Sequence, residues 1–211
     1  MKEYHKIETI YERDTNGTKK LIEGKFRNET VEYLRHNVWE FTEKVDGTNI
    51  RIHWDGHMIS FAGRTDKAQI PNHLMEYLNK TFLNDTTEEL FEQMFGEKEV
   101  ILFGEGYGPK IQKVGALYRP DVSFILFDIM VNGMYLARNN VEDIAIALGI
   151  AVVPIVLIGT LYDAVNYIRT SPESCIGFAP MEGVVGRPAV EVLDRRGNRV
   201  IVKIKVCDFV K

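Results

Sequence analysis

The chain contains only two cysteines, Cys175 and Cys207, and their spacing is not that of a C-x-x-C motif. Two cysteines cannot form the disulfide framework of a small secreted protein, so we expect two partly buried free thiols. The five histidines include no H-x-x-x-H pair on a plausible helix, which argues against a zinc site with the usual ligand spacing. These absences direct attention to other residue types.

Long apolar runs are also missing. No run approaches the roughly 18 residues that a membrane-spanning helix needs, and the N-terminus, MKEYHKIETIYERD, is charged from its second residue and lacks the apolar region of a signal peptide. We therefore expect a cytoplasmic protein without a membrane partner. No G-x-x-x-x-G-K-[ST] loop is present, and the glycines of GEGYG do not have the G-x-G-x-x-G spacing. These two facts argue against a P-loop kinase and a dinucleotide-binding domain.

What is present is typical of one globular domain. The chain has 211 residues, of which 45% are hydrophobic and 27% charged, and neither an internal repeat nor a linker-like stretch divides it. We predict a single domain over residues 1–211, in which residues 1–37 form an N-terminal extension packed on the rest.

The net charge of −4 is unevenly distributed. Residues 187–211 contain seven Lys or Arg against three Asp or Glu, a local charge of +4, which leaves −8 for residues 1–186. Because salt screens each charge beyond about 10 Å, a local basic surface suffices for phosphate contacts. A solvated, lysine-rich edge strand would give the same count, and the composition does not separate the two interpretations.

Hydrophobic periodicity predicts an α+β fold dominated by antiparallel pairing. We expect strands at residues 38–44, 48–54, 58–64, 100–104, 123–131, 183–185 and within 191–208. We expect helices at residues 72–82, 87–95, 140–148 and 161–170. Thr86 or Thr87 is the expected N-cap of the second helix, and GEGYGPK is interpreted as a glycine-rich turn after the strand at 100–104.

The segment EKVDGTN places Lys44 at a strand end, directly before an Asp46-Gly47 turn. Such a turn can direct the lysine amine into a cleft. A free lysine has a pKa of about 10.4, so a nucleophilic lysine needs neighbouring cations or desolvation to become neutral. A surface lysine beside a turn would give the same tetrapeptide, so this segment needs support from others.

Two further segments supply that support. In VKIK the strand period of two places Lys203 and Lys205 on one face, where they could bind a triphosphate. Glu105 and Glu182 are each flanked by glycine, which allows a ligand to approach closely. One carboxylate could accept ribose hydroxyls and the other could hold a divalent metal ion. An acidic residue in a surface turn would look the same.

Together, EKVDGTN, GRT, FGEGYG, FILFDI, MEGVV and VKIK occur in an order that resembles the covalent nucleotidyltransferases, the superfamily of ATP-dependent polynucleotide ligases and capping enzymes. The chain is most similar to the RNA ligase 2 branch of bacteriophages and RNA-editing ligases, over residues 38–209. The resemblance implies an ATP-grasp-like nucleotidyltransferase fold of antiparallel sheets flanked by helices, in a single adenylyltransferase domain.

The resemblance also implies roles for individual residues. Lys44 is the expected nucleophile that forms lysyl-AMP, and Glu182 is expected to support Mg²⁺ or Mn²⁺. Lys203 and Lys205 are expected to hold the α-phosphate during catalysis.

The remaining expected roles concern nucleotide binding. Glu43 would lie beside the adenine, and Asn49 would organise a phosphate or the metal ion. Arg64 would contact the ribose and phosphates, and Glu105 would receive a ribose hydroxyl. Phe127 would stack on the purine, although periodicity alone makes it a core residue.

The resemblance implies an ATP-dependent enzyme that joins RNA 5′-phosphate and 3′-hydroxyl ends through lysyl-AMP and an adenylylated 5′ end. The chain stops six residues after Lys205, so we expect neither the C-terminal OB domain of DNA ligases nor the helical domain of larger relatives. An accessory protein could replace that domain, and the oligomeric state stays open. A phage-encoded chain would act in the host cytoplasm.

Two other functions are compatible with the sequence. A DNA-nick ligase or a capping guanylyltransferase would use the same motifs on a different substrate. A non-catalytic nucleic-acid binding module would keep the fold and the basic C-terminal segment without turnover.

Overall fold

The computed structural model describes residues 1–210, and the contacts within it group the chain into two compact units. Unit 1 consists of Met1–His5 and Asp46–Val153, and unit 2 consists of Lys6–Val45 and Pro154–Lys211. The chain therefore passes from one unit to the other three times. Each unit is described separately below.

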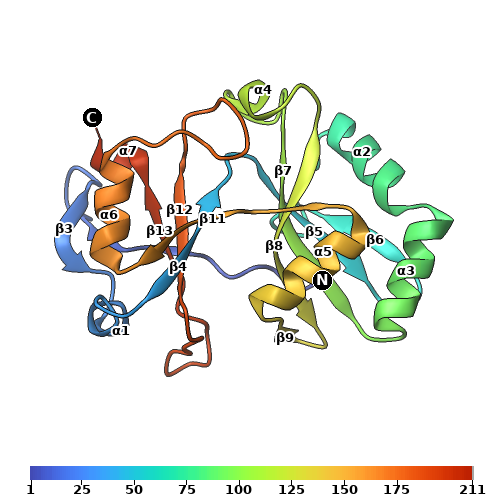
Figure 1. Ribbon diagram of the computed structural model, residues 1–211, viewed down its shortest axis with the longest axis horizontal. Helices are drawn as coiled ribbons and strands as arrows, with labels where there is room; N and C mark the ends of the chain where they lie inside the picture. Colours follow the sequence, from blue (N-terminus) through green and yellow to red (C-terminus); the bar gives the residue numbers. More distant parts are fainter. Residues whose placement is uncertain (211) are drawn as a thin grey trace. The chain divides into compact units, whose positions relative to one another are not determined.

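Unit 1 is built on a six-stranded sheet, in the order β10-β8-β7-β5-β6 with β9 paired to β8 (Figure 1). The strands are β5 (Thr48–Trp54), β6 (Ile59–Ala62), β7 (Val100–Tyr107), β8 (Ser123–Val131), β9 (Met134–Tyr135) and β10 (Ala151–Val152). All pairs are antiparallel except β8 with β10. The central strands β7 and β8 form the longest strand pair of this sheet.

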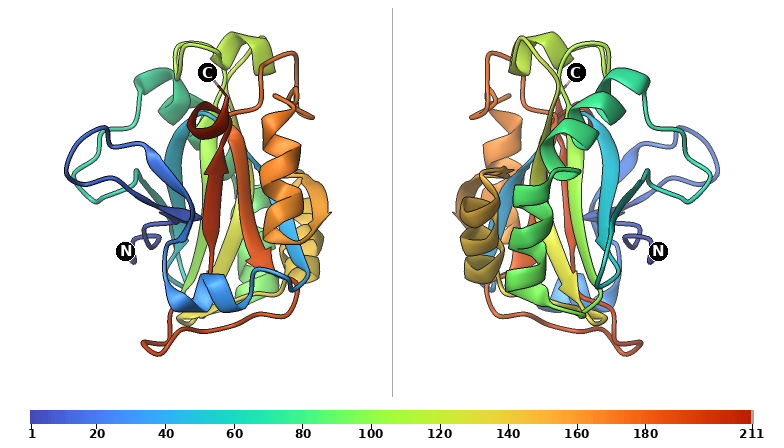
Figure 2. Two further views of the ribbon diagram at one scale, coloured as in Figure 1. Left: turned by 90° about the vertical axis from the view of Figure 1, so that its left-hand side faces the viewer. Right: turned by 90° about the vertical axis from the view of Figure 1, so that its right-hand side faces the viewer.

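Helices cover one face of this sheet. They are α2 (Asn72–Phe82), α3 (Asp85–Phe95) and α5 (Arg138–Leu148), with the short α4 (Gly115–Tyr118) in the β7–β8 connection; the green α2 and α3 stand against the sheet in the right-hand view of Figure 2. Leu74, Leu78 and Phe82 recur every four residues along α2 and are fully buried. This stripe packs against Phe124 and Leu126 in the main core of the unit.

Unit 2 is built on a five-stranded sheet, in the order β1-β13-β12-β4-β11. The strands are β1 (Glu8–Thr9), β4 (Trp39–Lys44), β11 (Ile155–Gly159), β12 (Gly183–Pro188) and β13 (Val202–Lys205). Only the β1–β13 pair is parallel. Because β1 pairs with Val202 and Lys203 on the side of β13 opposite β12, Lys203 does not lie on a solvated edge.

The helix α6 (Leu161–Arg169) lies along the sheet of unit 2, as the left-hand view of Figure 2 shows. It begins with a capping box, in which Thr160 and Asp163 bond each other's backbone N–H groups. Leu161, Ala164, Val165 and Ile168 face a core that includes Trp39 and Phe41. The unit also contains α1 (Glu29–Tyr33) and α7 (Val206–Phe209).

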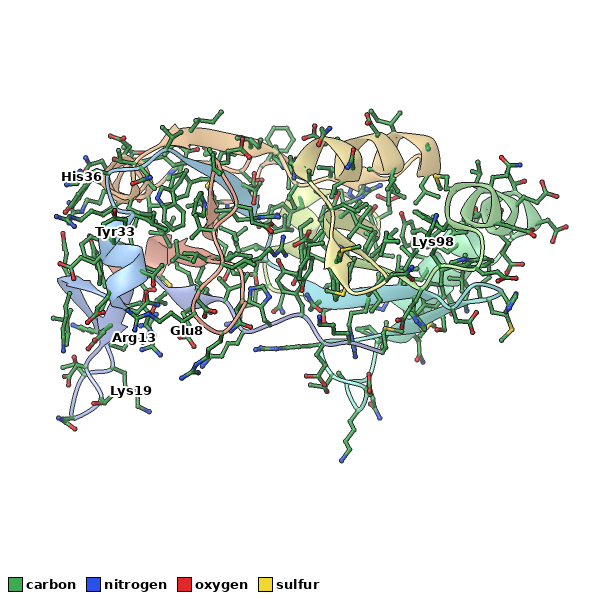
Figure 3. The ribbon with its side chains drawn as sticks, turned by 90° about the horizontal axis from the view of Figure 1, so that it is seen from below. Glu8, Arg13, Lys19, Tyr33, His36 and Lys98 are labelled. Atoms are coloured by element: carbon green, nitrogen blue, oxygen red, sulfur yellow. The ribbon has the colours of Figure 1, made fainter. Side chains whose placement is uncertain are left out.

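A hairpin of β2 (Tyr11–Arg13) and β3 (Leu21–Phe26) completes unit 2, with Lys19 at its tip in Figure 3. Arg13 on this hairpin donates from Nη2 to both carboxylate oxygens of Asp208, at 2.9 and 2.7 Å. Residues 6–37 thus include paired strands. The prediction of a single domain over 1–211, with residues 1–37 as an extension, stays a prediction.

Most predicted elements are confirmed. The helices expected at 72–82, 140–148 and 161–170 are present within two residues of those bounds, and Asn132-Gly133 forms the predicted turn with both φ angles positive. The N-cap of α3 is Asn84, not Thr86 or Thr87, because its side chain accepts the Thr87 N–H. The sheets are antiparallel-rich and flanked by helices, as predicted.

Three further predictions were wrong. The strand expected at 100–104 continues to Tyr107, so GEGY is strand and not turn. Residues 206–209 are helical, so the final strand ends at Lys205. Both cysteines are exposed instead of partly buried. Of the helices formed by residues 1–210, none is long and apolar enough to cross a membrane.

The error at GEGY has a packing cause. A Cβ on Gly104 would lie 2.2 Å from the ring of Phe124, and one on Gly106 would lie 2.4 Å from Leu74. The two glycines alternate with Phe103, Glu105 and Tyr107, so they share the helix-covered face of β7. They are glycines because large side chains of neighbouring elements fill the space, and not because the chain turns.

Candidate active site

In unit 2 the predicted nucleophile lies in a row of three residues across the sheet. Gly183 on β12 pairs with Lys44 on one side and with Lys205 on the other. A Cβ on Gly183 would lie 2.2 Å from the Ile204 carbonyl oxygen, so only glycine fits without displacing β13. With strands about 4.8 Å apart, the two lysine Cα atoms lie roughly 10 Å from each other with no side chain between them.

Glu182 joins the two lysine amines. Its Oε2 lies 2.5 Å from Lys44 Nζ, and its Oε1 lies 2.6 Å from Lys205 Nζ. The three side chains are 17 to 30% exposed, so these ion pairs are partly shielded from solvent screening. The arrangement places two cations and one carboxylate at the adjoining ends of β4 and β13, where an anionic ligand can exchange for the carboxylate.

The environment of Lys205 favours its charged form. Burial of the ammonium lowers the pKa of Lys205, but the hydrogen bond and charge of Glu182, with the charges of Cys207 and Asp208, outweigh it and leave the pKa above its ordinary value. Lys205 is therefore a permanent cation at neutral pH. Lys203 pairs with Val185 across β12 and lies on the same face of β13 as Lys205, as predicted.

Glu43 lies on the other face of β4 from Lys44 and is 1% exposed. Its carboxylate accepts hydrogen bonds from Ser174 Oγ at 2.5 Å and from the Cys175 N–H at 2.8 Å. Desolvation raises the pKa of Glu43, and the two hydrogen bonds oppose the rise. The carboxylate thus anchors the segment that leads to Glu182. Its predicted place beside the adenine stays a prediction.

In unit 1, Glu105 and Asn49 are directly paired between β7 and β5. Asn49 Oδ1 is buried and has no hydrogen-bond partner among the described residues, which is unusual because buried polar atoms are normally satisfied. The preceding turn packs onto this pair: a Cβ on Gly47 would lie 2.3 Å from the Gly106 carbonyl oxygen and 2.7 Å from Glu105 Cγ. Gly47 is therefore required, because Gly106 and Glu105 lie too close to its backbone for a side chain.

The segment that follows Glu105 also holds this turn. Gln112 Nε2 donates to the Gly47 carbonyl oxygen at 2.9 Å, and the Asp46 N–H donates to Tyr118 Oη at 3.2 Å. The Asp46-Gly47 turn after the predicted nucleophile is thus fastened by residues of the β7–β8 connection.

Arg64 is exposed in the loop after β6. The residues near it, Gly63 and Asp66, are bonded by Arg51, which the sequence did not indicate as a site residue. Arg51, fully buried on β5, donates to the Gly63 carbonyl oxygen and to Asp66, each at 2.8 Å. Strand alternation predicts Arg51 on the face opposite Ile50 and Ile52, which is ordinarily solvated, so nothing in the sequence indicated its burial.

Phe127 is the extra residue of a β-bulge in β8, because Gly104 pairs with Leu126 and Phe103 with Asp128. Its half-buried ring meets Tyr4 edge to face, with centroids 5.1 Å apart. Tyr4 also donates to Asp128 at 2.8 Å. The purine-stacking role of Phe127 stays a prediction, whereas Phe124, fully buried, is a core residue as expected.

The structure brings Lys44, Glu182 and Lys205 into contact in unit 2, and it pairs Asn49 with Glu105 in unit 1. Among residues 1–210 no group of three or more His, Cys, Asp or Glu side chains gathers into a metal site. Ser174 and Arg51, which the sequence did not single out, hold Glu43 and the Arg64 loop respectively.

Solved structures with a similar fold are RNA ligases of Naegleria gruberi. A lysine-to-methionine mutant with AMP and Mn matches with a TM-score of 0.63 and 18% identity, over 83% of this chain and 52% of that one. The ligase with PPi matches with a TM-score of 0.62 and 21% identity, over 83% and 51%. A lysine-to-alanine mutant with ATP and Mn matches with a TM-score of 0.62 and 18% identity, over 95% and 58%.

The chain therefore spans little more than half the length of these structures, and it has the nucleotidyltransferase-like fold that they share. The family model described as RNA ligase matches residues 37–205, and the chain belongs to the RNA ligase family. A search of curated proteins found no match.

Proposed function

We propose that this protein is an ATP-dependent RNA ligase that joins 5′-phosphate and 3′-hydroxyl ends through a lysyl-AMP intermediate. The observation that carries the proposal is the contact of Lys44 and Lys205 with the single carboxylate of Glu182, in a chain of the RNA ligase family. Two amines held by one carboxylate, at the ends of the strands on either side of β12, suit a reaction in which one attacks a phosphate and the other neutralises its charge.

In the first step, Lys44 Nζ attacks the α-phosphorus of ATP. A P–N bond forms, the P–O bond to the β-phosphate breaks, and pyrophosphate leaves. Attack requires a neutral amine, so the ion pair of Lys44 with Glu182 has to open and the ammonium has to give its proton to solvent water. Lys205, which stays charged, and Lys203 then face the negative charge that develops on the non-bridging oxygens.

Glu182 is also the proposed protein ligand of Mg²⁺ or Mn²⁺. Mg²⁺ is commonly bound through one or two carboxylates together with water and substrate phosphates, so a lone carboxylate fits it. Once bound, the ion supplies charge neutralisation at the phosphates.

Unit 1 supplies the proposed nucleotide contacts. Glu105 accepts the ribose hydroxyls, Arg64 contacts ribose and phosphates, Phe127 stacks on the purine, and Asn49 uses its unsatisfied oxygen toward a phosphate-bound ion or water. The use of ATP and a divalent ion is supported by the similar Naegleria structures, which contain ATP or AMP with Mn.

In the later steps the AMP group moves from Lys44 to the RNA 5′-phosphate, and the 3′-hydroxyl then attacks that phosphate with loss of AMP. Both are phosphoryl transfers that depend on positioning and charge neutralisation, so no second covalent residue is needed. The same lysines can serve all three steps.

The test is the intact mass of the purified protein after incubation with Mg²⁺ and either ATP or GTP, followed by peptide mapping. We expect a gain of one AMP on Lys44 with ATP only, and no gain in Lys44→Ala. A GMP adduct would indicate a capping guanylyltransferase. Joining of nicked DNA but not of RNA would indicate a DNA ligase. Salt-sensitive RNA binding without any adduct, in folded protein that is not already adenylylated, would indicate a binding module.

A further inference from the structure

Arg51 is a charged residue in the interior of unit 1. It lies in the middle of β5, and none of its side chain is exposed. All three guanidinium nitrogens donate a hydrogen bond: Nε to the Gly63 carbonyl oxygen at 2.8 Å, Nη1 to the Met1 carbonyl oxygen at 2.9 Å, and Nη2 to Asp66 Oδ1 at 2.8 Å. Burial of a charge is costly unless such bonds compensate it.

Two of these three acceptors stand on either side of Arg64. Gly63 precedes it directly, and Asp66 follows it by two residues. The loop after β6 leaves the sheet and projects from it in Figure 3, and it is closed on itself by the Ala68 N–H bond to the Thr65 carbonyl oxygen at 3.1 Å. Arg51 thus bonds both flanks of this loop.

We propose that Arg51 is a positioning residue for Arg64, acting through Gly63 and Asp66 to hold the loop in the conformation that presents Arg64 to the nucleotide. This inference rests on the proposed role of Arg64 in ATP binding. If Arg51 only filled space in the core, an apolar side chain such as that of the neighbouring Ile50 or Ile52 would give a more stable fold. The planar guanidinium can bond two separate points of the loop at fixed angles, which a lysine cannot do.

Asp66→Ala is the decisive variant because the Asp66 side chain is 65% exposed, so its removal leaves no cavity in the core. The hydrogen bond from Arg51 holds the pKa of Asp66 below its ordinary range, so the carboxylate is ionised at neutral pH. We expect the Kd for ATP and the KM for ATP in lysyl-AMP formation to rise roughly three- to fivefold, the range of a partly exposed ion pair. The kcat should stay unchanged, while the melting temperature should fall modestly, because the buried Arg51 guanidinium loses one of its three partners.

The matched control is Asp55→Ala. Asp55 is an exposed aspartate of the same unit whose carboxylate accepts the His57 and Met58 N–H groups in the β5–β6 turn, with no bond to the 63–68 loop. We expect ATP binding to be unchanged. An equal loss of affinity in Asp55→Ala would mean that Asp66 acts only through the general charge of the unit, and it would overturn the proposal.

A double-mutant cycle with Arg64→Ala tests whether Asp66 acts through Arg64. We expect Asp66→Ala to have no further effect on the Kd for ATP once Arg64 is absent, whereas independent sites would give multiplying effects. Multiplying effects would overturn the proposal. An Arg64→Ala variant with unchanged ATP affinity would also overturn it, while lysyl-AMP formation by the native chain would still stand.

Hydrogen exchange gives a readout that does not depend on ATP. In Asp66→Ala and in the more severe Arg51→Lys, we expect faster exchange of the amides of residues 63–68, with protection of β5 and β7 retained. Unchanged exchange in this loop would overturn the proposal even if both variants bound ATP weakly. A native chain that forms no lysyl-AMP but shows these loop effects would contradict the proposed function alone.

Discussion

Lys44 and Lys205 flank Gly183 in one row across the sheet of unit 2, and a single carboxylate, that of Glu182, bonds both amines. The row brings together residues that are 161 positions apart in the sequence, because β12 pairs with β4 on one side and with β13 on the other. The placement of the two lysines therefore depends on β12, although β12 contributes only Gly183 to the row.

Gly183→Ala tests this dependence. The added Cβ would meet the Ile204 carbonyl oxygen at 2.2 Å, so β12 and β13 would have to separate. We expect unit 2 to lose about 1–3 kcal/mol of stability, and we expect lysyl-AMP formation to fall sharply. Chemical denaturation and a label-transfer assay measure the two effects. Gly17→Ala is the control, because Gly17 is exposed and its Cβ would meet only one side chain, that of Asp14, at 3.0 Å; equal losses in both variants would refute the argument.

Lys205→Ala should slow lysyl-AMP formation about 10²- to 10³-fold, because removal of one preorganised charge from a phosphoryl-transfer site costs on that order. The fold should persist, since the lysine is partly exposed. Lys205→Arg keeps the charge and should recover part of the rate. Single-turnover kinetics with labelled ATP measure the step, and a rate within threefold of the native value for Lys205→Ala would contradict the assigned role.

Gly106→Ala should destabilise unit 1 by about 1–3 kcal/mol, because the new Cβ would lie 2.4 Å from Leu74 Cδ2. Trimming that neighbour should relieve the clash, so Leu74→Val is expected to cost less stability in the Gly106→Ala background than in the native chain. Thermal denaturation of the four proteins measures the coupling. Strictly additive losses would show that the glycine is required for a reason other than packing.

Glu43 should make stability depend on pH. Its pKa is raised in the folded protein, chiefly by desolvation, so the folded state binds a proton more tightly than the unfolded state does. The corresponding stability is present at acidic pH and is lost as the pH rises from the ordinary glutamate value through the raised one. Glu43→Gln cannot titrate, so its free energy of unfolding relative to the native chain should increase as the pH rises above the ordinary pKa of a glutamate, about 4.3. A pH-independent difference in denaturant unfolding would contradict this prediction.

Arg13→Met should destabilise unit 2 by roughly 1.5–3 kcal/mol, the usual range for hydrogen bonds to charged groups. Arg13 bonds both oxygens of Asp208, whose side chain is 11% exposed, so the variant leaves a buried carboxylate with fewer partners. Urea denaturation measures the loss. Asp121→Ala removes a comparable ion pair with Arg119 in which the carboxylate is 66% exposed, and no measurable change is expected there.

Several features could be predicted from the sequence because they depend on neighbouring residues. The period of Leu74, Leu78 and Phe82 placed α2 correctly, and the alternation of VKIK placed Lys203 and Lys205 on one face. The order of six short motifs was sufficient to indicate the RNA ligase family, which the match over residues 37–205 confirms. None of these inferences required a contact between distant parts of the chain.

Other features depended on what lies across the sheet. The glycines of GEGY have the sequence signature of a turn, yet they are strand residues because Phe124 and Leu74 occupy the space that side chains would need. Arg51 has the alternation of an exposed strand residue, yet it is buried because Met1, Gly63 and Asp66 surround its guanidinium.

The sequence by itself thus determined the four longer helices α2, α3, α5 and α6, the common face of the VKIK lysines, the family and the identity of the chemical groups, because periodicity and motif order are properties of short segments. The tertiary structure alone decided which of these groups meet. Strand pairing between distant segments joined Lys44, Glu182 and Lys205, and the close approach of backbones determined where only glycine fits, since both are set by packing across the sheet and not by neighbours in the chain.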